Sequence, residues 1–424
     1  MILPPLLVLA ISTTPISVTH SQNPIDPIVG ANERIKRIRM AIIEVKVVDS
    51  SGEPIPGVKV TIEQTGHKFL FGCAAISLMK HASASEEQQY KNRFADLFNF
   101  ATVLTYWPDT NPTPTTFETR LLDTQVAWLN ENNITVKGHP LFLAGSSPGW
   151  ADQNPSGVRN QTEQRVEQIV NYFKGKIEIW DAVGDSTTAR NARNGLGAWA
   201  RSAGVADLTA DMFGWAHKSD PSATLLYNDY NLDQKYLDLI TDLKRRKSSI
   251  NVIGLEAHMG YTNWPLIRVW ETAETFKKLG FPIHFSEITV LSNHTADGQI
   301  VSDPNNLDGE SVQADYVEKM YTLLFSHPSV SAIAWWNFVD GDWDTIPSGL
   351  LKRNLTPKKA YSRLLHLIKT KWWTKSSGAS DWNGTFKVRG FLGKYKVSVT
   401  TSSGVLQREI DLDRSGQGLT IQLP

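Results

Sequence analysis

The chain has 424 residues, of which 41% are hydrophobic and 20% are charged, so it has the composition of a globular protein with a sizeable core. Lys and Arg number 43, and Asp and Glu number 43, which leaves no basic excess to bind a polyanion, so we expect no nucleic-acid partner. The single cysteine, Cys73, excludes an intramolecular disulfide framework and a zinc site built from several cysteines.

Residues 1–22 are predicted to be a signal peptide. Their apolar stretch, ILPPLLVLAIS at 2–12, is too short to span a bilayer as a helix, and we expect no membrane span. No Lys or Arg precedes this stretch and it contains Pro4 and Pro5, so a disordered leader or a misplaced start stays open. On the first interpretation the protein is secreted.

The two ends of the remaining chain have a β-rich texture. Residues 39–66 alternate apolar and polar side chains around a Ser-Gly-Glu-Pro turn at 51–54, which predicts a hairpin. Residues 379–424 read as short strands separated by glycines. Because chain ends often lie close together, we expect these two segments to pack with each other.

Between these ends, residues 67–372 repeat a strand–helix pattern. The strand-like runs are HKFLFGCAA, FATVLTYW, TVKGHPLFL, IEIWDAVGD, ATLLYNDY, VIGLEAHM, PIHFSEITV and SAIAWWNFVDG. A helical period is clear in 85–98, with Ser85 and Gln88 as its capping box. Eight such units predict an α/β fold: a closed (β/α)8 TIM barrel with small β-rich N- and C-terminal additions. The alternative, a doubly wound open sheet, usually has a glycine-rich turn after its first strand, and Phe71-Gly-Cys-Ala-Ala-Ile-Ser is no such turn.

Polar and aromatic side chains gather at the ends of the predicted strands, where the active site of such a barrel lies. In chain order they are His139, Trp180, Asp181, Asp185, Asn228, Asp229, Tyr230, Glu256, His258, Glu287, Trp335, Trp336, Asn337, Asp340 and Trp343. Two carboxylates facing each other across the mouth are what glycoside hydrolysis requires, and aromatic faces stack on sugar rings. The competing interpretations are a structural ion pair for Glu287, buried hydrogen-bonded histidines, and core packing for each Trp.

Residues 67–372 resemble the catalytic domain of glycoside hydrolase family 10, the xylanase family. The matching pieces, in order, are FLFGCA, KGHPLF, IWDAVGD, LLYNDYN, VIGLEAHMG, HFSEITV and WWNFVDGDW, followed by Pro-Lys-Lys-Ala-Tyr at 357–361. The resemblance implies retaining hydrolysis of β-1,4-xylan or a related plant-type polysaccharide. It also implies that the protein needs no metal or other cofactor, and we expect a monomer.

The resemblance further implies roles for single residues. Glu287 is similar to the family's nucleophile, Asp185 stands at the acid/base position, and His258 is similar to the neighbour that keeps the nucleophile ionised and oriented. The residues implied to bind substrate or support the site are Trp107, His139, Trp180, Asn228, Asp229, His258, Trp336 and Trp343.

The end of the fourth strand departs from the family pattern, which is Trp-Asp-x-x-Asn-Glu; here Gly184 and Asp185 fill the last two places. Asp is shorter than Glu by one methylene, about 1.5 Å. Losing general-acid help costs about 10²–10⁴ in rate. Two functions therefore stay open: a working glycosidase with a weakened acid/base, and a catalytically inactive carbohydrate-binding pseudoenzyme on the same barrel.

The C-terminal segment also resembles β appendages found after some family 10 barrels. It is interpreted either as a structural lid on the bottom of the barrel or as a sugar-binding module with Trp382, Phe391 and Tyr395 as exposed aromatics.

Overall fold

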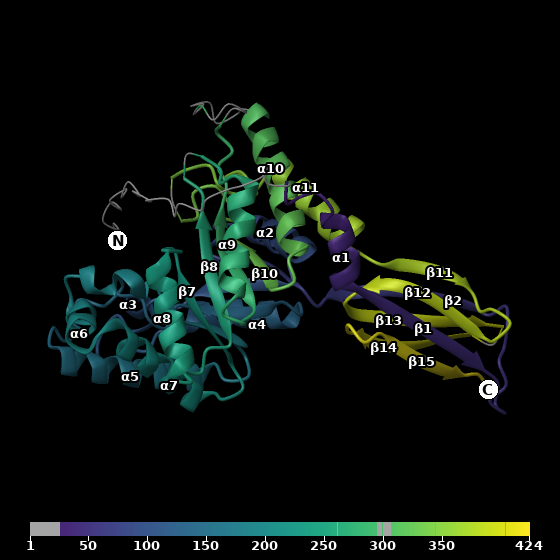
Figure 1. Ribbon diagram of the computed structural model, residues 1–424, viewed down its shortest axis with the longest axis horizontal. Helices are drawn as coiled ribbons and strands as arrows, with labels where there is room; N and C mark the ends of the chain where they lie inside the picture. The colour runs from purple at the N-terminus through teal and green to yellow at the C-terminus, as the bar shows by residue number, and fades with distance from the viewer. Residues whose placement is uncertain (1–25, 261, 295–298, 300–306, 344, 403) are drawn as a thin grey trace.

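A computed structural model describes residues 26–260, 262–294, 299, 307–343, 345–402 and 404–424 (Figure 1). The predicted signal peptide, residues 1–22, lies outside the described residues. Eight parallel strands close into a barrel in the order β10-β3-β4-β5-β6-β7-β8-β9, which confirms the (β/α)8 prediction and excludes the open sheet. These strands are β3 (Leu70–Ala74), β4 (Phe100–Leu104), β5 (Thr135–His139), β6 (Ile179–Gly184), β7 (Thr224–Asp229), β8 (Val252–His258), β9 (Ile283–Thr289) and β10 (Val330–Trp335).

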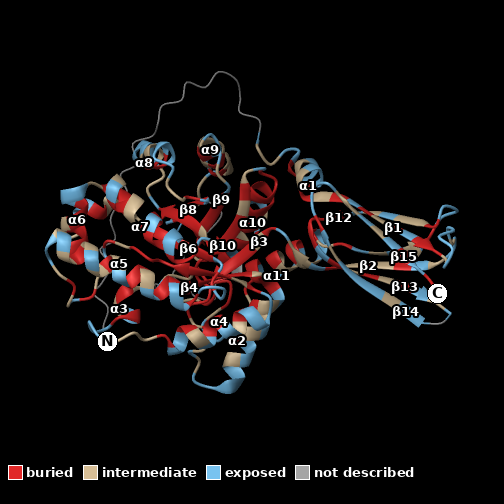
Figure 2. Cartoon of the chain, turned by 90° about the horizontal axis from the view of Figure 1, so that it is seen from below, coloured by how far each residue is buried: buried red, intermediate tan, exposed pale blue. Residues whose placement is uncertain are grey.

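Helices follow the barrel strands and cover their outer side, with buried faces toward the barrel and exposed faces outward (Figure 2). They are α2 (Ala84–Leu97), α3 (Trp107–Thr110), α4 (Arg120–Glu131), α5 (Pro155–Tyr172), α6 (Gly195–Ala203), α7 (Val205–Ser219), α8 (Gln234–Arg245), α9 (Leu266–Lys277), α10 (Leu307–Phe325) and α11 (Lys359–His366), with a 3-10 helix η1 (Ser186–Asn191) and a short π-helix η2 (Leu367–Lys371). Among the described residues, no helix is both long and apolar enough to cross a membrane.

The start of α2 lies two residues before the predicted one. Ser83 has extended backbone, and its hydroxyl accepts a hydrogen bond from the backbone N–H of Glu86 at 3.2 Å. The same hydroxyl donates to Oε2 of Glu86 at 3.0 Å. Ser85 is already inside the helix, so the predicted capping box of Ser85 and Gln88 is wrong. The stretch Ser-Ala-Ser repeats the capping residue, and sequence spacing alone does not separate the two serines.

The two chain ends form one β-sandwich beside the barrel (Figure 1). One sheet has the order β12-β1-β15 and the other β11-β2-β13-β14. The strands are β1 (Met40–Val48), β2 (Lys59–His67), β11 (Lys375–Ala379), β12 (Thr385–Phe391), β13 (Gly393–Thr401), β14 (Gly404–Leu412) and β15 (Gln417–Gln422). Alternate apolar side chains of both sheets, such as Ile43 and Val45 against Val60 and Ile62, fill the space between them.

The predicted hairpin at residues 39–66 is wrong. β1 pairs with β12 and β15, so both of its edges are occupied, and β2 pairs with β11 and β13 in the other sheet. The turn at 51–54 carries the chain from one sheet to the other. Two of the three aromatics suggested for a sugar-binding surface are also buried: Phe391 is 7% exposed and Tyr395 0%, whereas Trp382 is 90% exposed.

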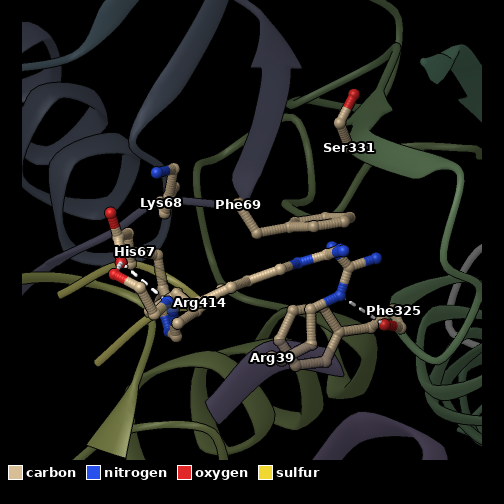
Figure 3. A pocket seen from close by; sticks show the side chains of 10 residues that line it. Arg39, His67, Lys68, Phe69, Phe325, Ser331 and Arg414 are labelled. Atoms are coloured by element: carbon tan, nitrogen blue, oxygen red, sulfur yellow. Dashed lines mark hydrogen bonds between the residues drawn. The ribbon is translucent and has the colours of Figure 1, made fainter. Parts of the chain in front are cut away.

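Arg39, the last residue of α1 (Ala31–Arg39), joins the sandwich to the bottom of the barrel. Its guanidinium donates to the carbonyl oxygens of Phe325, His327 and Val330 at 2.7–2.8 Å and lies over the rings of Phe69 and Phe325 (Figure 3). Burial, with a smaller contribution from the charge of Arg414, lowers its pKa to about 9. A cavity of about 470 Å³ lies here, at the end of the barrel opposite to the strand ends that carry the predicted catalytic residues.

Candidate active site

The carboxyl ends of the barrel strands bring the predicted catalytic residues to one mouth. Glu256 on β8 and Glu287 on β9 are register partners, and Gly184 on β6 is the partner of Asn228 on β7. The register shifts between Leu255 and Glu256, and such a bulge changes the direction of the side chain that follows it. As a result, Glu256 and Glu287 lie close enough to accept hydrogen bonds from one amide group, Nδ2 of Asn228, at 2.8 Å each.

Glu287 is buried and held by three partners. Nε2 of His258 lies 3.0 Å from Oε2, Nδ2 of Asn228 donates to Oε1, and Nδ1 of His139 lies 3.6 Å from Oε1. Burial alone favours the neutral carboxyl, but the positive potential of His139, His258 and Lys137 outweighs it and lowers the pKa of Glu287. The structure therefore presents an ionised carboxylate in a fixed orientation at the end of β9.

His139 lies between this carboxylate and a buried ion pair below it. Its Nδ1 is 2.6 Å from Oδ2 of Asp181, and Nζ of Lys137 is 2.7 Å from the same oxygen. Both members of the ion pair are fully buried. Burial raises the pKa of Asp181, but Lys137 and His139 more than offset this and the net shift is downward. The pair fixes the orientation of His139 and supplies positive potential beneath Glu287.

Asp185 follows β6 directly and has left-handed backbone, with φ 52° and ψ 30°. Asp tolerates this region better than most residues, because its short polar side chain bonds locally. Oδ1 of Asp185 is buried and has no hydrogen-bond partner among the described residues. Burial and the charges of Asp229 and Glu287 raise the pKa of Asp185 well above its ordinary value.

Asp229 fixes the segment that carries Asp185. Its carboxylate accepts hydrogen bonds from the backbone N–H and the hydroxyl of Thr187 at 3.0 and 2.7 Å, and from the backbone N–H of Asn231 at 2.9 Å. Burial raises the pKa of Asp229 to about 6 against these hydrogen bonds. Asp229 therefore ties the first turn of η1 to the end of β7 and acts on Asp185 through the backbone.

The family resemblance assigns no role to Glu256. Glu256 nevertheless lies at the end of a strand, which is the same signal that singles out His258. It is 7% exposed. Burial and the neighbouring charges of Asp185, Glu287 and Asp229 raise its pKa well above the ordinary value. Tyr106 is a second such residue: its ring lies edge-on to His139 at 5.9 Å, and burial and the charges of Glu287, Glu256 and Asp185 raise its pKa.

Two of the predicted aromatics line the mouth. Trp336 is buried and contacts the rings of His139 and His258 edge-on at 5.2 and 5.9 Å. Trp343 stacks on His258 at 4.9 Å with an interplanar angle of 26°, and 41% of it is exposed. Tyr230, which directly follows β7, is 43% exposed.

The other two predicted Trp residues are buried in the main hydrophobic core. Trp180 points to the side of β6 opposite Asp181, is fully buried, and covers Gly138 so closely that a Cβ there would lie 2.3 Å from its ring. Trp107 is 4% exposed and contacts Trp150 edge-on at 5.6 Å.

Two groups at the mouth have donor atoms within 4.8 Å of one another: His139, Asp181 and Glu287, and Glu256, His258 and Glu287. In each group the histidine nitrogen already lies at hydrogen-bond distance from a carboxylate oxygen. These contacts occupy the atoms that a cation would use, and we assign no metal to the site.

Comparison with known families decides what kind of barrel this is. The sequence profile of glycosyl hydrolase family 10 matches residues 60–367. The chain belongs to this family. The resemblance seen in the strand-end motifs is thereby confirmed, and the family 10 barrel accounts for most of the chain.

Two of the chain's relatives are longer proteins. It is 28% identical to endo-1,4-beta-xylanase 1 of Arabidopsis thaliana over 91% of this chain and 39% of that protein. It is 28% identical to the anti-sigma-I factor RsgI6 of Acetivibrio thermocellus over 96% of this chain and 52% of that protein. The chain thus spans 39–52% of the length of these two relatives. Among solved structures, xylanase 10B of Thermotoga petrophila, determined with xylobiose, has a TM-score of 0.60 at 24% identity, covering 72% of this chain and 95% of that one. That likeness shows a shared fold.

The end of β6 is where this family 10 site departs from the family pattern. A Cβ added at Gly184 would meet the carbonyl oxygen of Phe142 at 3.5 Å and a methyl group of Leu143 at 3.6 Å, which are ordinary contacts. The backbone N–H of Gly184 donates to the same carbonyl at 2.8 Å. The 140–144 loop therefore contacts Gly184 but leaves room for a Cβ at this position.

Proposed function

We propose that this protein hydrolyses β-1,4-xylan or a related plant-type polysaccharide by a retaining double displacement. The observation that carries the proposal is the state of Glu287: buried, ionised through His139 and Lys137, and held by His258 and Asn228 on its two oxygens. A carboxylate that exists only to balance charge needs no such fixed direction. A nucleophile does, because attack requires alignment with the anomeric carbon.

In the first step an oxygen of Glu287 attacks the anomeric carbon and the glycosidic bond breaks. Asp185, at the acid/base position, gives its proton to the departing oxygen. The raised pKa of Asp185 supports this role, because the carboxyl stays protonated where Glu287 is ionised. In the second step Asp185 takes a proton from water as the water oxygen attacks the same carbon and releases Glu287.

Trp343 supports a carbohydrate substrate. Its exposed indole stacks on the same imidazole that holds Glu287, so a sugar ring on the indole lies beside the nucleophile. Stacking of this kind contributes about 0.5–1.5 kcal/mol beyond the buried area. Tyr230, which directly follows β7, is a second exposed aromatic side chain at the ends of the strands.

The test uses 2,4-dinitrophenyl β-xylobioside, whose leaving group needs little protonation. We expect turnover with retained anomeric configuration by NMR, and loss of that turnover in Glu287→Gln. The matched control is Glu178→Gln: Glu178 is exposed and lies just before β6, at the opposite end of the barrel, so its loss leaves turnover intact.

The outcome that contradicts the proposal is a folded protein with no turnover of this substrate. If that protein is retained on a xylan affinity gel, and Trp343→Ala abolishes the retention, the barrel is a carbohydrate-binding pseudoenzyme.

A further inference from the structure

Asp185 and Glu256 both lie against Asn228 at the barrel mouth. The backbone N–H of Asp185 donates to the carbonyl oxygen of Asn228 at 3.1 Å, and Nδ2 of Asn228 donates to Oε1 of Glu256 at 2.8 Å. Burial is the main cause that raises the pKa of both carboxyl groups, and the charge of Glu287 raises both further. Two ionised carboxylates only accept hydrogen bonds, so a hydrogen bond within this pair needs a proton on one of them. Oδ1 of Asp185 is buried and has no other hydrogen-bond partner among the described residues, which leaves that oxygen free to share such a proton.

The charges around the pair also favour a retained proton. Asp229, Glu256 and Glu287 are buried carboxyl groups in one mouth and Asp185 is half-buried beside them, while the positive potential of His139 and Lys137 acts on Glu287. Among the described residues, the basic side chain at ion-pair distance from Glu256 is His258, whose Nε2 lies 3.7 Å from Oε2 of Glu256 and 3.0 Å from Oε2 of Glu287. The other titratable groups that feel the charges of both Asp185 and Glu256 are Tyr106 and Tyr230; the hydroxyl of Tyr236 donates instead to the carbonyl oxygens of Tyr227 and Gly254. Like charges this close cannot both ionise at low cost.

Asn228 separates the roles of the two glutamates. Its Nδ2 bonds Oε1 of Glu256 and Oε1 of Glu287 at 2.8 Å, and its Oδ1 accepts from the hydroxyl of Ser286, so the amide cannot turn. Glu287 lies 3.0 Å from Nε2 of His258 and 3.6 Å from Nδ1 of His139, whereas Glu256 lies 3.7 Å from Nε2 of His258. The basic neighbours therefore favour the ionised form of Glu287 more than that of Glu256.

We propose that the acid/base of this protein is the Asp185–Glu256 pair, which holds one proton between its two carboxyl groups. This inference rests on the proposed function. Glu256 supplies the second carboxyl that keeps the proton at the mouth, and the pair replaces the single long acid whose place Asp185 fills.

The steps balance with the pair as one unit. In glycosylation, Glu287 forms a bond to the anomeric carbon, the glycosidic bond breaks, and the shared proton passes to the leaving oxygen, so that the pair becomes doubly negative. In deglycosylation, water attacks the same carbon, its proton returns to the pair, and the Glu287–carbon bond breaks. The doubly negative state is the stronger base, which favours the second step.

Kinetics of phenyl β-xylobioside, whose leaving group needs protonation, tests the pair. The general acid must be protonated, so activity is lost as pH rises through its pKa. In Glu256→Gln a neutral amide that donates N–H replaces the second carboxyl, so we expect the basic limb of kcat/KM to move at least one pH unit toward acid. We expect phenyl turnover at pH 7 to fall about 10²-fold, while dinitrophenyl turnover falls less than about threefold. We expect the double variant, Asp185→Asn with Glu256→Gln, to lose no more phenyl turnover than Asp185→Asn alone, because the two carboxyl groups act as a unit.

The matched control is Glu310→Gln, which removes a buried carboxylate paired with Lys352 at 2.9 Å on α10 and leaves the basic limb in place. The proposed pair is overturned if Glu256→Gln leaves the basic limb of kcat/KM unchanged and keeps phenyl turnover within about threefold of the parent.

Infrared titration of the resting protein gives a readout that needs no turnover. We expect a protonated-carboxyl band at neutral pH that titrates at lower pH in both Asp185→Asn and Glu256→Gln. Absence of this band in the parent protein overturns the pair. If the band behaves as expected but dinitrophenyl β-xylobioside is not hydrolysed, the proposed function fails while the shared proton stands.

Discussion

Nε2 of His258 lies 3.0 Å from Oε2 of Glu287, and the indole of Trp343 stacks on the same imidazole at 4.9 Å. One side chain thus connects the carboxylate proposed as nucleophile to the exposed aromatic surface proposed to bind sugar. Disturbing His258 is expected to affect the chemistry, and disturbing Trp343 to affect binding.

Replacing His258 by Ala removes a partner that lowers the pKa of Glu287. Glu287 must be ionised to attack, so activity is lost as pH falls through its pKa. With that pKa raised, the acidic limb of kcat/KM moves to higher pH, and kcat at neutral pH falls about 10–100-fold. His258→Gln keeps an N–H donor and recovers part of the loss. An acidic limb that is the same in parent and His258→Ala contradicts this role.

Replacing Trp343 by Ala removes an exposed ring without touching the carboxyl groups. We expect KM for xylo-oligosaccharides to rise about 5–10-fold with kcat little changed, in keeping with a stacking contribution of about 1 kcal/mol. Trp382, 90% exposed on the sandwich, is the matched control, and Trp382→Ala leaves KM unchanged. Weaker xylan binding in Trp382→Ala would instead place a sugar site on the sandwich.

Replacing Asn228 by Ala leaves Oε1 of Glu256 and Oε1 of Glu287 without their common donor. We expect kcat to fall about 10–100-fold and the free energy of unfolding to fall about 1–3 kcal/mol. The control is Asn251→Ala, because Oδ1 of Asn251 accepts from the backbone N–H of Leu225 at 2.8 Å at the other end of β7. That variant lowers stability in urea but not kcat. Equal kinetic effects from both variants would contradict a specific role for Asn228.

Combining Gly184→Asn with Asp185→Glu restores the family pattern at the end of β6. The Asn Cβ meets only ordinary contacts, so we expect Gly184→Asn alone to fold within about 1 kcal/mol of the parent. The double variant is expected to raise kcat/KM for phenyl β-xylobioside by orders of magnitude. No rise in a folded double variant counts against Asp185 as the acid/base position.

Replacing Arg39 by Met leaves the carbonyl oxygens of Phe325, His327 and Val330 without their buried donor. We expect a loss of about 3 kcal/mol or more in the free energy of unfolding, measured by urea denaturation, with kcat unchanged. A kcat that falls in step with stability would show that the sandwich acts on the barrel mouth.

The architecture could be predicted because each level of the sequence agrees with it. Runs such as VIGLEAHM and HFSEITV are apolar on both sides, which suits only strands covered on both faces, and helices of regular period separate them. The pairing of β1 could not be predicted, since its partners β12 and β15 lie more than 300 residues away and local turn chemistry suggests a hairpin. The N-cap of α2 could not be predicted either, because local spacing fits both Ser83 and Ser85.

The site could be predicted as a set of strand ends but not as a network. His139, His258, Asn228 and Glu287 fall at the carboxyl ends of strands, and the barrel brings them together. Whether a Trp lies at the mouth depends on which side of its strand it occupies, so Trp180 cannot be told from Trp336 by position alone. Glu256 could not be singled out because a bulge and a shared Asn228, neither visible in the sequence, place it beside Glu287.

Covalent trapping is the most direct test of Glu287 as the nucleophile of a retaining enzyme. The probe is 2,4-dinitrophenyl 2-deoxy-2-fluoro-β-xylobioside, which forms the glycosyl-enzyme without needing the acid and then hydrolyses slowly because the fluorine at C2 destabilises the charged transition state. The account predicts one sugar adduct by intact mass, located by peptide mapping at Glu287 and absent from Glu287→Gln. An unmodified protein, or an adduct on another residue, would contradict it.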